Sequence, residues 1–229
     1  MGAEGQPWLY QIMAASRLVC VGTAISPHFV LTTAHCVLAR AGPKYLQQVG
    51  SQTFISLQSV VIHHQWGLGW DLALIKTKTS LRHFICLPAA PLHNHQLRAV
   101  QVGFKLSNLD RQSDNLNLFY QNITLPSQQS GCKGPACSGH PDLHKWVKIF
   151  DKNILLLFTF GWSGQVPGSL LETQTRPGSA LQLLGIVSGR ISDGSECSPT
   201  PWLVRLDTEK SLEWIAAVTS ENIPVTEVL

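Results

Sequence analysis

The sequence predicts an all-β fold, because short apolar stretches recur along the chain and turn-forming residues separate them. The apolar stretches lie at 29–31, 54–57, 60–62, 72–75 and 183–187. The clusters rich in Gly or Pro lie at 41–43, 88–91, 131–139 and 164–178. This spacing is typical of a β-sandwich or a β-barrel, and it does not fit an alternation of strands and helices.

One helix is expected near the C-terminus, over about residues 208–218. Residues 207–210 offer capping side chains, and apolar residues follow at helical spacing. These apolar residues are Leu212, Trp214, Ile215 and Val218. The segment 220–229 carries Pro224 and is expected to form a loose tail.

Composition excludes several classes of protein. The chain has 229 residues, of which 44% are hydrophobic and 14% charged, so it can bury a sizeable core and is not a disordered segment. Its formal net charge is +3 and the basic residues are scattered singly, which argues against a nucleic-acid partner. No apolar run is long enough for a membrane span.

The chain has six cysteines, at positions 20, 36, 86, 132, 137 and 197. None of them shows the paired C-x-x-C spacing of structural zinc sites, so no metal and no other cofactor is expected. An even count indicates disulfides and an oxidising compartment. The triplet Asn122-Ile123-Thr124 is a glycosylation sequon, which agrees with such a compartment.

The N-terminal residues 1–7 do not support export to an oxidising compartment. They include no basic segment and no apolar segment, so no secretory signal is visible. Either the signal is missing through truncation or alternative splicing, or the product stays inside the cell. The sequence leaves both alternatives open.

The strongest functional motif lies between Cys20 and Cys36. A strand rich in β-branched residues leads into the turn Thr33-Ala34-His35-Cys36. A disulfide between Cys20 and Cys36 would hold the imidazole of His35 at a strand end, where it could act as a general base. The alternative is a histidine without chemistry beside a stabilising disulfide, but the whole motif favours the base.

The motif around His35 resembles the histidine motif of the trypsin/chymotrypsin family of serine proteases. Other segments of the chain resemble further landmarks of that family in the same order: Pro7-Trp8, Trp70 to Lys76, Phe84 to Pro88, Leu184 to Ser188, Pro201 to Leu206, and Leu212 to Ile215. The resemblance covers residues 5–218, most strongly before residue 90. It implies one domain over 1–229, made of two six-stranded antiparallel barrels at about 5–98 and 99–205, followed by the helix and the tail. It also implies a secreted protein.

The resemblance further implies a catalytic triad. Asp71 stands where the family places the aspartate that orients the histidine, and Ser163 in Gly161-Trp162-Ser163-Gly164 is the best candidate for the nucleophile. The amides of Gly161 and Ser163 would then bind the oxyanion. Ser138 is a poorer candidate, because it lies too far before Ser188.

The resemblance also assigns a substrate cleft, and the cysteines of the chain suggest two disulfides. The cleft would include Leu157, Ser188, Gly189 and Arg190, with an apolar primary pocket. The expected disulfides are Cys20–Cys36 and Cys132–Cys137. Cys86 would be free or bridged to another chain, and Cys197 lacks the partner that the family supplies, because Thr159 stands in that position.

The family's activation device is missing from the motif around Ser163. Relatives place an aspartate before the nucleophile, where it binds a newly released N-terminal Ile or Val, and this chain has Trp162 there. No Ile-Val-Gly-Gly segment precedes Trp8, and Arg190 would project where a substrate backbone should pair.

These losses favour a non-catalytic homologue that binds a protein or peptide in the cleft. The alternatives are an active serine endopeptidase without basic specificity, and a poorly folding splice product suggested by the odd run 145–160.

Overall fold

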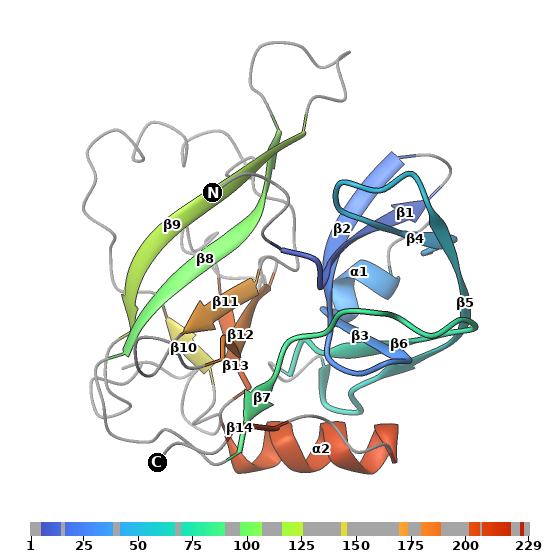
Figure 1. Cartoon of the computed structure of the whole chain (residues 1–229). Coiled ribbons are helices and arrows are strands. Elements are labelled where there is room, and N and C mark those ends of the chain that lie inside the picture. The colour runs from blue at the N-terminus through green and yellow to red at the C-terminus, as the bar shows by residue number, and fades with distance from the viewer. Residues whose placement is uncertain are drawn as a thin grey trace, which may run out of the picture.

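A computed structural model describes the following parts of the chain: residues 6–14, 17–38, 42–66, 70–89, 97–106, 116–125, 143–145, 170–173, 180–188, 202–206, 208–220 and 225–226. They form two groups of strands with a C-terminal helix below them (Figure 1).

The first group is a closed six-stranded barrel with the strand order β1-β2-β3-β6-β5-β4. Its strands are β1 (Leu9–Ala14), β2 (Arg17–Ala24), β3 (Phe29–Thr32), β4 (Tyr45–Gln48), β5 (Phe54–Ile62) and β6 (Ala73–Thr77). Closure occurs between β1 and β4, which pair from Tyr10↔Gln48 to Met13↔Tyr45. The first of the two expected barrels is therefore present.

Strands β3 and β6 are buried on both faces, which explains why their sequences are continuous apolar runs. On β3, Val30 packs in the core inside the barrel, whereas Phe29 and Leu31 pack in a second core that faces the other half of the molecule. Ile75 and Leu74 divide in the same way on β6. These two strands thus contribute side chains to both cores.

The second group is a six-stranded sheet with the order β10-β13-β12-β11-β8-β9. Its strands are β8 (Leu97–Leu106), β9 (Leu116–Leu125), β10 (Leu143–Lys145), β11 (Leu170–Thr173), β12 (Gln182–Ser188) and β13 (Trp202–Arg205). All of their pairings are antiparallel. The number of strands and their antiparallel pairing agree with the prediction for this half, and closure of a second barrel stays a prediction.

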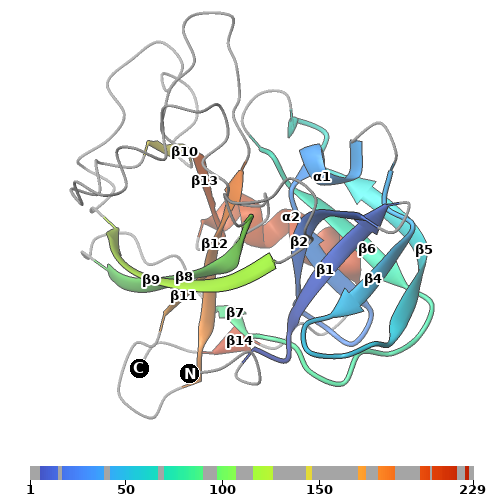
Figure 2. The same cartoon turned by 90° about the horizontal axis from the view of Figure 1, so that it is seen from above.

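One continuous apolar core joins the two groups of strands. It contains Leu31 and Leu74 from the barrel, Val102 from β8, Ile186 from β12 and Ile215 from the C-terminal helix. Figure 2 shows the barrel and the sheet side by side, with β7 (Leu87–Pro88) between them. Strands β3 and β6 are therefore packed on both of their faces.

The C-terminal helix α2 spans Glu209–Thr219, one residue later than the expected range 208–218. Thr208 is its N-cap, and the Thr208 hydroxyl accepts a hydrogen bond from the backbone N–H of Ser211 at 3.2 Å. Ile215 faces the core, because it is fully buried. In the described part of the chain, no helix combines the length and the apolar character needed to cross a membrane.

The segment after α2 differs from the expected loose tail at two residues. Val225 and Thr226 form β14, which pairs in parallel with Leu87 and Pro88 of β7. This short pairing returns the end of the chain to the connection between the two groups of strands.

Candidate active site

The register of β3 and β6 brings His35 and Asp71 together, although they are 36 residues apart in sequence. Thr32, the last residue of β3, pairs with Ala73, the first residue of β6. The chain leaving β3 enters the short helix α1 (Ala34–Leu38), which carries His35, while Asp71 immediately precedes β6. An antiparallel pair places the end of one strand beside the start of the other, so the two residues meet at one edge of the barrel.

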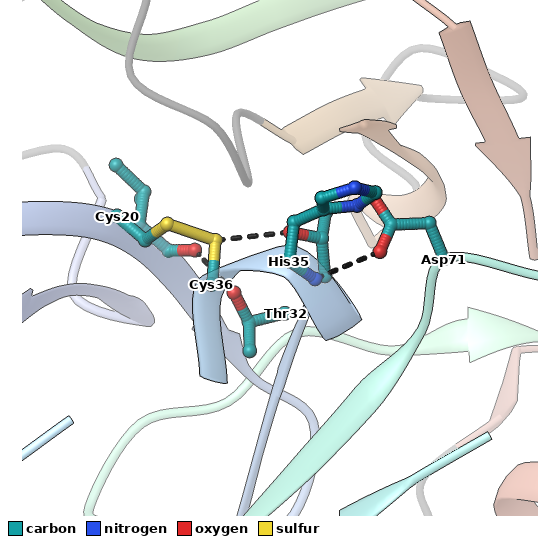
Figure 3. The surroundings of a disulfide bond; sticks show 7 residues. Cys20, Thr32, His35, Cys36 and Asp71 are labelled. Atoms are coloured by element: carbon teal, nitrogen blue, oxygen red, sulfur yellow. Dashed lines mark hydrogen bonds and ion pairs between the residues drawn. A yellow bond between two sulfur atoms is a disulfide. The ribbon is translucent and has the colours of Figure 1, made fainter. Parts of the chain in front are cut away.

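Asp71 accepts two hydrogen bonds from His35. The backbone N–H of His35 donates to Oδ1 at 2.9 Å, and the imidazole Nδ1 lies 2.9 Å from Oδ2 (Figure 3). The Asp71 side chain is fully buried, whereas the His35 side chain is 41% exposed. The Nδ1 atom is therefore committed to the carboxylate, and Nε2 is left as the nitrogen that can exchange a proton with a reacting group.

This hydrogen bond with Asp71 raises the pKa of His35 above its ordinary value of 6.5. Burial acts in the opposite direction, and the negative charge of Asp71 adds to the increase. An imidazole stabilised in its protonated form by a buried carboxylate is a competent acceptor of a proton from a nucleophile. The arrangement can thus supply general-base chemistry.

The disulfide and two threonines anchor the turn that carries His35. Cys20 of β2 and Cys36 of α1 are bridged, with their Cα atoms 5.7 Å apart, so this predicted disulfide is present (Figure 3). The Thr32 hydroxyl donates to the carbonyl of Val21 at 2.8 Å. The Thr33 hydroxyl donates to Sγ of Cys36 at 2.9 Å. The helix bearing His35 is therefore tied to β2 by the disulfide, and the end of β3 that leads into this helix is tied to β2 by the Thr32 hydrogen bond.

Trp66 is a residue of the site that the sequence interpretation missed. Its ring lies edge-on to the His35 imidazole, with the ring centroids 5.7 Å apart and the planes at 90°. The Trp66 side chain remains exposed, at 38% of the residue's surface. No pattern of apolar residues in the sequence singles out Trp66. The one feature that could have indicated its role is that an aromatic residue stands five positions before the predicted aspartate.

Most of the other predicted site residues lie outside the described residues. These are Leu157, Gly161, Ser163, Gly189 and Arg190 of the predicted nucleophile segment and cleft, and Cys132, Cys137 and Cys197. Ser188 is the last residue of β12, where it pairs with Trp202. Asn122 lies within β9 and pairs with Val100 of β8. Among the described cysteines Cys86 is free, and it is partly buried.

The structure thus brings together four of the predicted residues: the His35–Asp71 pair and the bridged Cys20 and Cys36. The catalytic roles of His35, Asp71 and Ser163 stay predictions.

Comparison with known proteins assigns the chain to a family. The trypsin family model matches residues 2–140, which is more than half of the chain. Ovochymase-2 of Mus musculus is 28% identical over 169 residues, which cover 59% of this chain and 27% of ovochymase-2, so the chain spans about a quarter of the length of this curated relative.

Solved structures agree on the fold. A structure of kallikrein-related peptidase 10 superimposes with a TM-score of 0.67 at 17% identity, covering 97% of this chain and 100% of that one. A structure of the same peptidase in complex with Zn2+ covers the same shares at 17% identity with a TM-score of 0.63. At this level of identity the likeness concerns the fold alone. Together with the match over residues 2–140, the mostly β architecture and the C-terminal helix, it shows that the chain belongs to the trypsin family and is a trypsin-like serine protease homologue.

Proposed function

We propose that this chain is a catalytically impaired member of the trypsin family that acts by binding a protein or peptide in the cleft beside His35 and Asp71. The observation that carries the proposal is Trp162, which stands immediately before the candidate nucleophile Ser163. Relatives place an aspartate there, and its ion pair with a liberated N-terminus organises the oxyanion hole and the primary pocket. An indole has no negative charge and cannot form that ion pair.

Loss of this negative charge weakens the stabilisation of the transition state. Tetrahedral intermediates of acyl transfer need donors aimed at the developing oxyanion, and the loss of one donor lowers the rate by about a hundredfold to a thousandfold. Binding of an extended peptide does not need those donors. A cleft with the imidazole of His35 and the exposed ring of Trp66 on one side can therefore keep a ligand-binding role after turnover has declined.

A second candidate function is an active serine endopeptidase, and the His35–Asp71 geometry is the observation that favours it. In that case Ser163 Oγ attacks the scissile carbonyl while Nε2 of His35 takes the hydroxyl proton and then delivers it to the leaving amine. Asp71 holds Nδ1 of His35, at 2.9 Å, throughout. The amides of Gly161 and Ser163 would bind the oxyanion, and Leu157 would give the primary pocket an apolar preference.

A fluorophosphonate probe separates these two functions. We expect the disulfide-bonded wild-type protein to be labelled no more strongly than the Ser163→Ala variant. The matched control is Ser138→Ala, which removes the other candidate serine and should leave the signal unchanged. Labelling at Ser163 that disappears in Ser163→Ala and in His35→Ala would overturn the binding proposal in favour of the endopeptidase.

The binding role is tested with peptides selected from a random displayed library against the oxidised protein. In NMR titrations with a selected peptide, the ring resonances of His35 should shift on binding, because its side chain is 41% exposed. His28 and His83 serve as internal references. Selected peptides that shift these references and leave His35 unchanged would place the binding surface elsewhere and contradict the proposal.

We also propose that the chain matures in an oxidising compartment of the secretory route. The Cys20–Cys36 disulfide supports this, because such bridges persist where thiols are not continuously reduced. The sequon at Asn122 would then be available for glycosylation. Treatment of the protein from secreting cells with an N-glycosidase should convert Asn122 to aspartate, a mass change detectable in the peptide that contains it. An unmodified Asn122 in secreted protein would refute the glycosylation.

A further inference from the structure

His63 is a buried residue at the centre of an aromatic cluster that includes Trp70, the neighbour of Asp71. It directly follows β5 and is 4% exposed. Its ring is stacked on Trp70, with centroids 5.0 Å apart and planes 13° apart, and on His64 at 4.7 Å. The ring of Trp214, from α2, contacts it at 4.9 Å. One imidazole therefore connects the end of β5, the segment before β6 and the C-terminal helix.

The same imidazole closes the turn that leads toward Asp71. Its Nδ1 accepts a hydrogen bond from the backbone N–H of Gln65 at 3.1 Å, so this nitrogen carries a lone pair and the ring is neutral. The backbone of His63 is also engaged, because its N–H donates to the Leu72 carbonyl and its carbonyl accepts from the Trp66 N–H, both at 3.0 Å. A proton on Nδ1 would remove the acceptor for Gln65 and place a charge between indole rings.

The turn closed by His63 contributes one contact to His35, and the residue stacked on His63 precedes the other. Trp66 lies edge-on to the imidazole, and Asp71 accepts both hydrogen bonds described above. Trp70, which is stacked on His63, is the residue immediately before Asp71. His63 is thus connected to Asp71 through Trp70, and to the His35 ring through the turn that holds Trp66.

We propose that His63 is a positioning residue for the His35–Asp71 pair, and that protonation of His63 in acid loosens the turn and separates the pair while the fold persists. The proposal rests on the ring contacts and on the Nδ1 hydrogen bond. It does not depend on whether the chain turns over a substrate, so it stands apart from the proposed function.

The charged groups around His63 are few in the described part of the molecule. His64 is the titratable group in contact with the ring. The contacts from α2 and from the segment before β6 are Trp214 and Trp70, which do not ionise. Glu213, next to Trp214, is exposed, and Asp71, next to Trp70, is bound to His35.

Burial lowers the pKa of His63 from its ordinary 6.5 to about 4, and the neighbouring His64 contributes to this decrease. Because the folded state disfavours the protonated ring, its contribution to stability is full above pH 6.5 and is lost as the pH falls toward 4. The pKa of His35 moves in the opposite direction. In mild acid, His35 is therefore protonated and paired with Asp71 while His63 remains neutral.

The test is an NMR titration of the full chain from pH 7 to pH 3.5, with far-UV circular dichroism in parallel. The readout is the downfield signal of the proton between Nδ1 of His35 and Asp71. We expect this signal to disappear with the same midpoint as the His63 ring shifts, before the circular dichroism changes. Titration of His63 without loss of the signal, or loss of the signal solely with global unfolding, would overturn the proposal.

Two variants exclude the protonation of Asp71 as the cause. His63→Phe keeps an aromatic ring and removes the titration, so the signal should survive to lower pH. His64→Gln changes an exposed residue and removes the neighbouring positive charge, so the midpoint should move to higher pH. His64→Gln decides the question if His63→Phe does not fold. Midpoints that stay at the wild-type pH would show that His63 does not position the pair.

Discussion

Removal of the Cys20–Cys36 disulfide tests how the site is anchored. The double variant Cys20→Ala/Cys36→Ala keeps small apolar side chains at two buried positions and removes the covalent tie between β2 and α1. The bridge closes a loop with a sequence separation of 16 residues. For a loop of this length, the entropy of the unfolded chain predicts a loss of about 3 kcal/mol.

That loss converts into a measurable change in melting temperature. For a domain of this size each kcal/mol corresponds to about 2–4 °C, so the Tm should fall by roughly 6–12 °C. The variant also removes Sγ of Cys36, the acceptor for the Thr33 hydroxyl beside His35. We therefore expect the ring resonances of His35 to broaden well below the new Tm.

Denaturation by urea and by heat, combined with NMR of the His35 ring, provides the assay. Cys86→Ala is the matched control, because Cys86 is free and lies outside the bridge. It should change the free energy of unfolding by clearly less than the double variant. A loss below about 1 kcal/mol in the double variant, with sharp His35 resonances, would refute the view that this bridge holds the site.

The remaining predictions concern a close contact, a helix cap and the charge of the site. A Cβ at Gly22 would lie 2.6 Å from Cγ1 of Val30, so Gly22→Ala should cost about 1–3 kcal/mol in urea denaturation, and Val30→Ala should cost less in that background than in the wild type. Thr208→Ala removes the cap of α2 and should cost about 1 kcal/mol by the same measurement; an unchanged midpoint would contradict the capping role. Since Asp71 raises the pKa of His35 above 6.5, the pair stabilises the fold fully below that pH and the contribution is lost as the pH rises through the raised pKa. Asp71→Asn should therefore cost more stability at pH 5.5 than at pH 9, and an equal cost at both would argue against the charged pair.

Much of the fold could be predicted from local patterns. The apolar runs at 29–31 and 72–75 predicted an all-β fold, and they lie in and next to β3 and β6, which are buried on both faces. The capping residues before Leu212 predicted a helix that begins within one residue of α2. These features depend on periodicity and on caps, which neighbouring residues determine, so they are visible without the rest of the molecule.

The order of the motifs also made the His35–Asp71 pair predictable. The resemblance placed His35 after one strand and Asp71 before another, and the structure adds that Thr32 pairs with Ala73. The nucleophile segment around Ser163 was predicted by the same resemblance and lies outside the described residues. Its catalytic role stays a prediction.

The sequence by itself indicated the class of fold, because the spacing of apolar and turn residues depends on local structure. The resemblance of its motifs to the trypsin family indicated the family and the residues that meet at the barrel edge. Tertiary structure alone decided that Trp66 lies against the His35 imidazole and that His63 is buried between Trp70 and Trp214. The contacts of Trp66 with His35 and of Trp214 with His63 join segments far apart in the chain. They follow from the closure of the barrel and the docking of α2, which no local pattern of residues can encode.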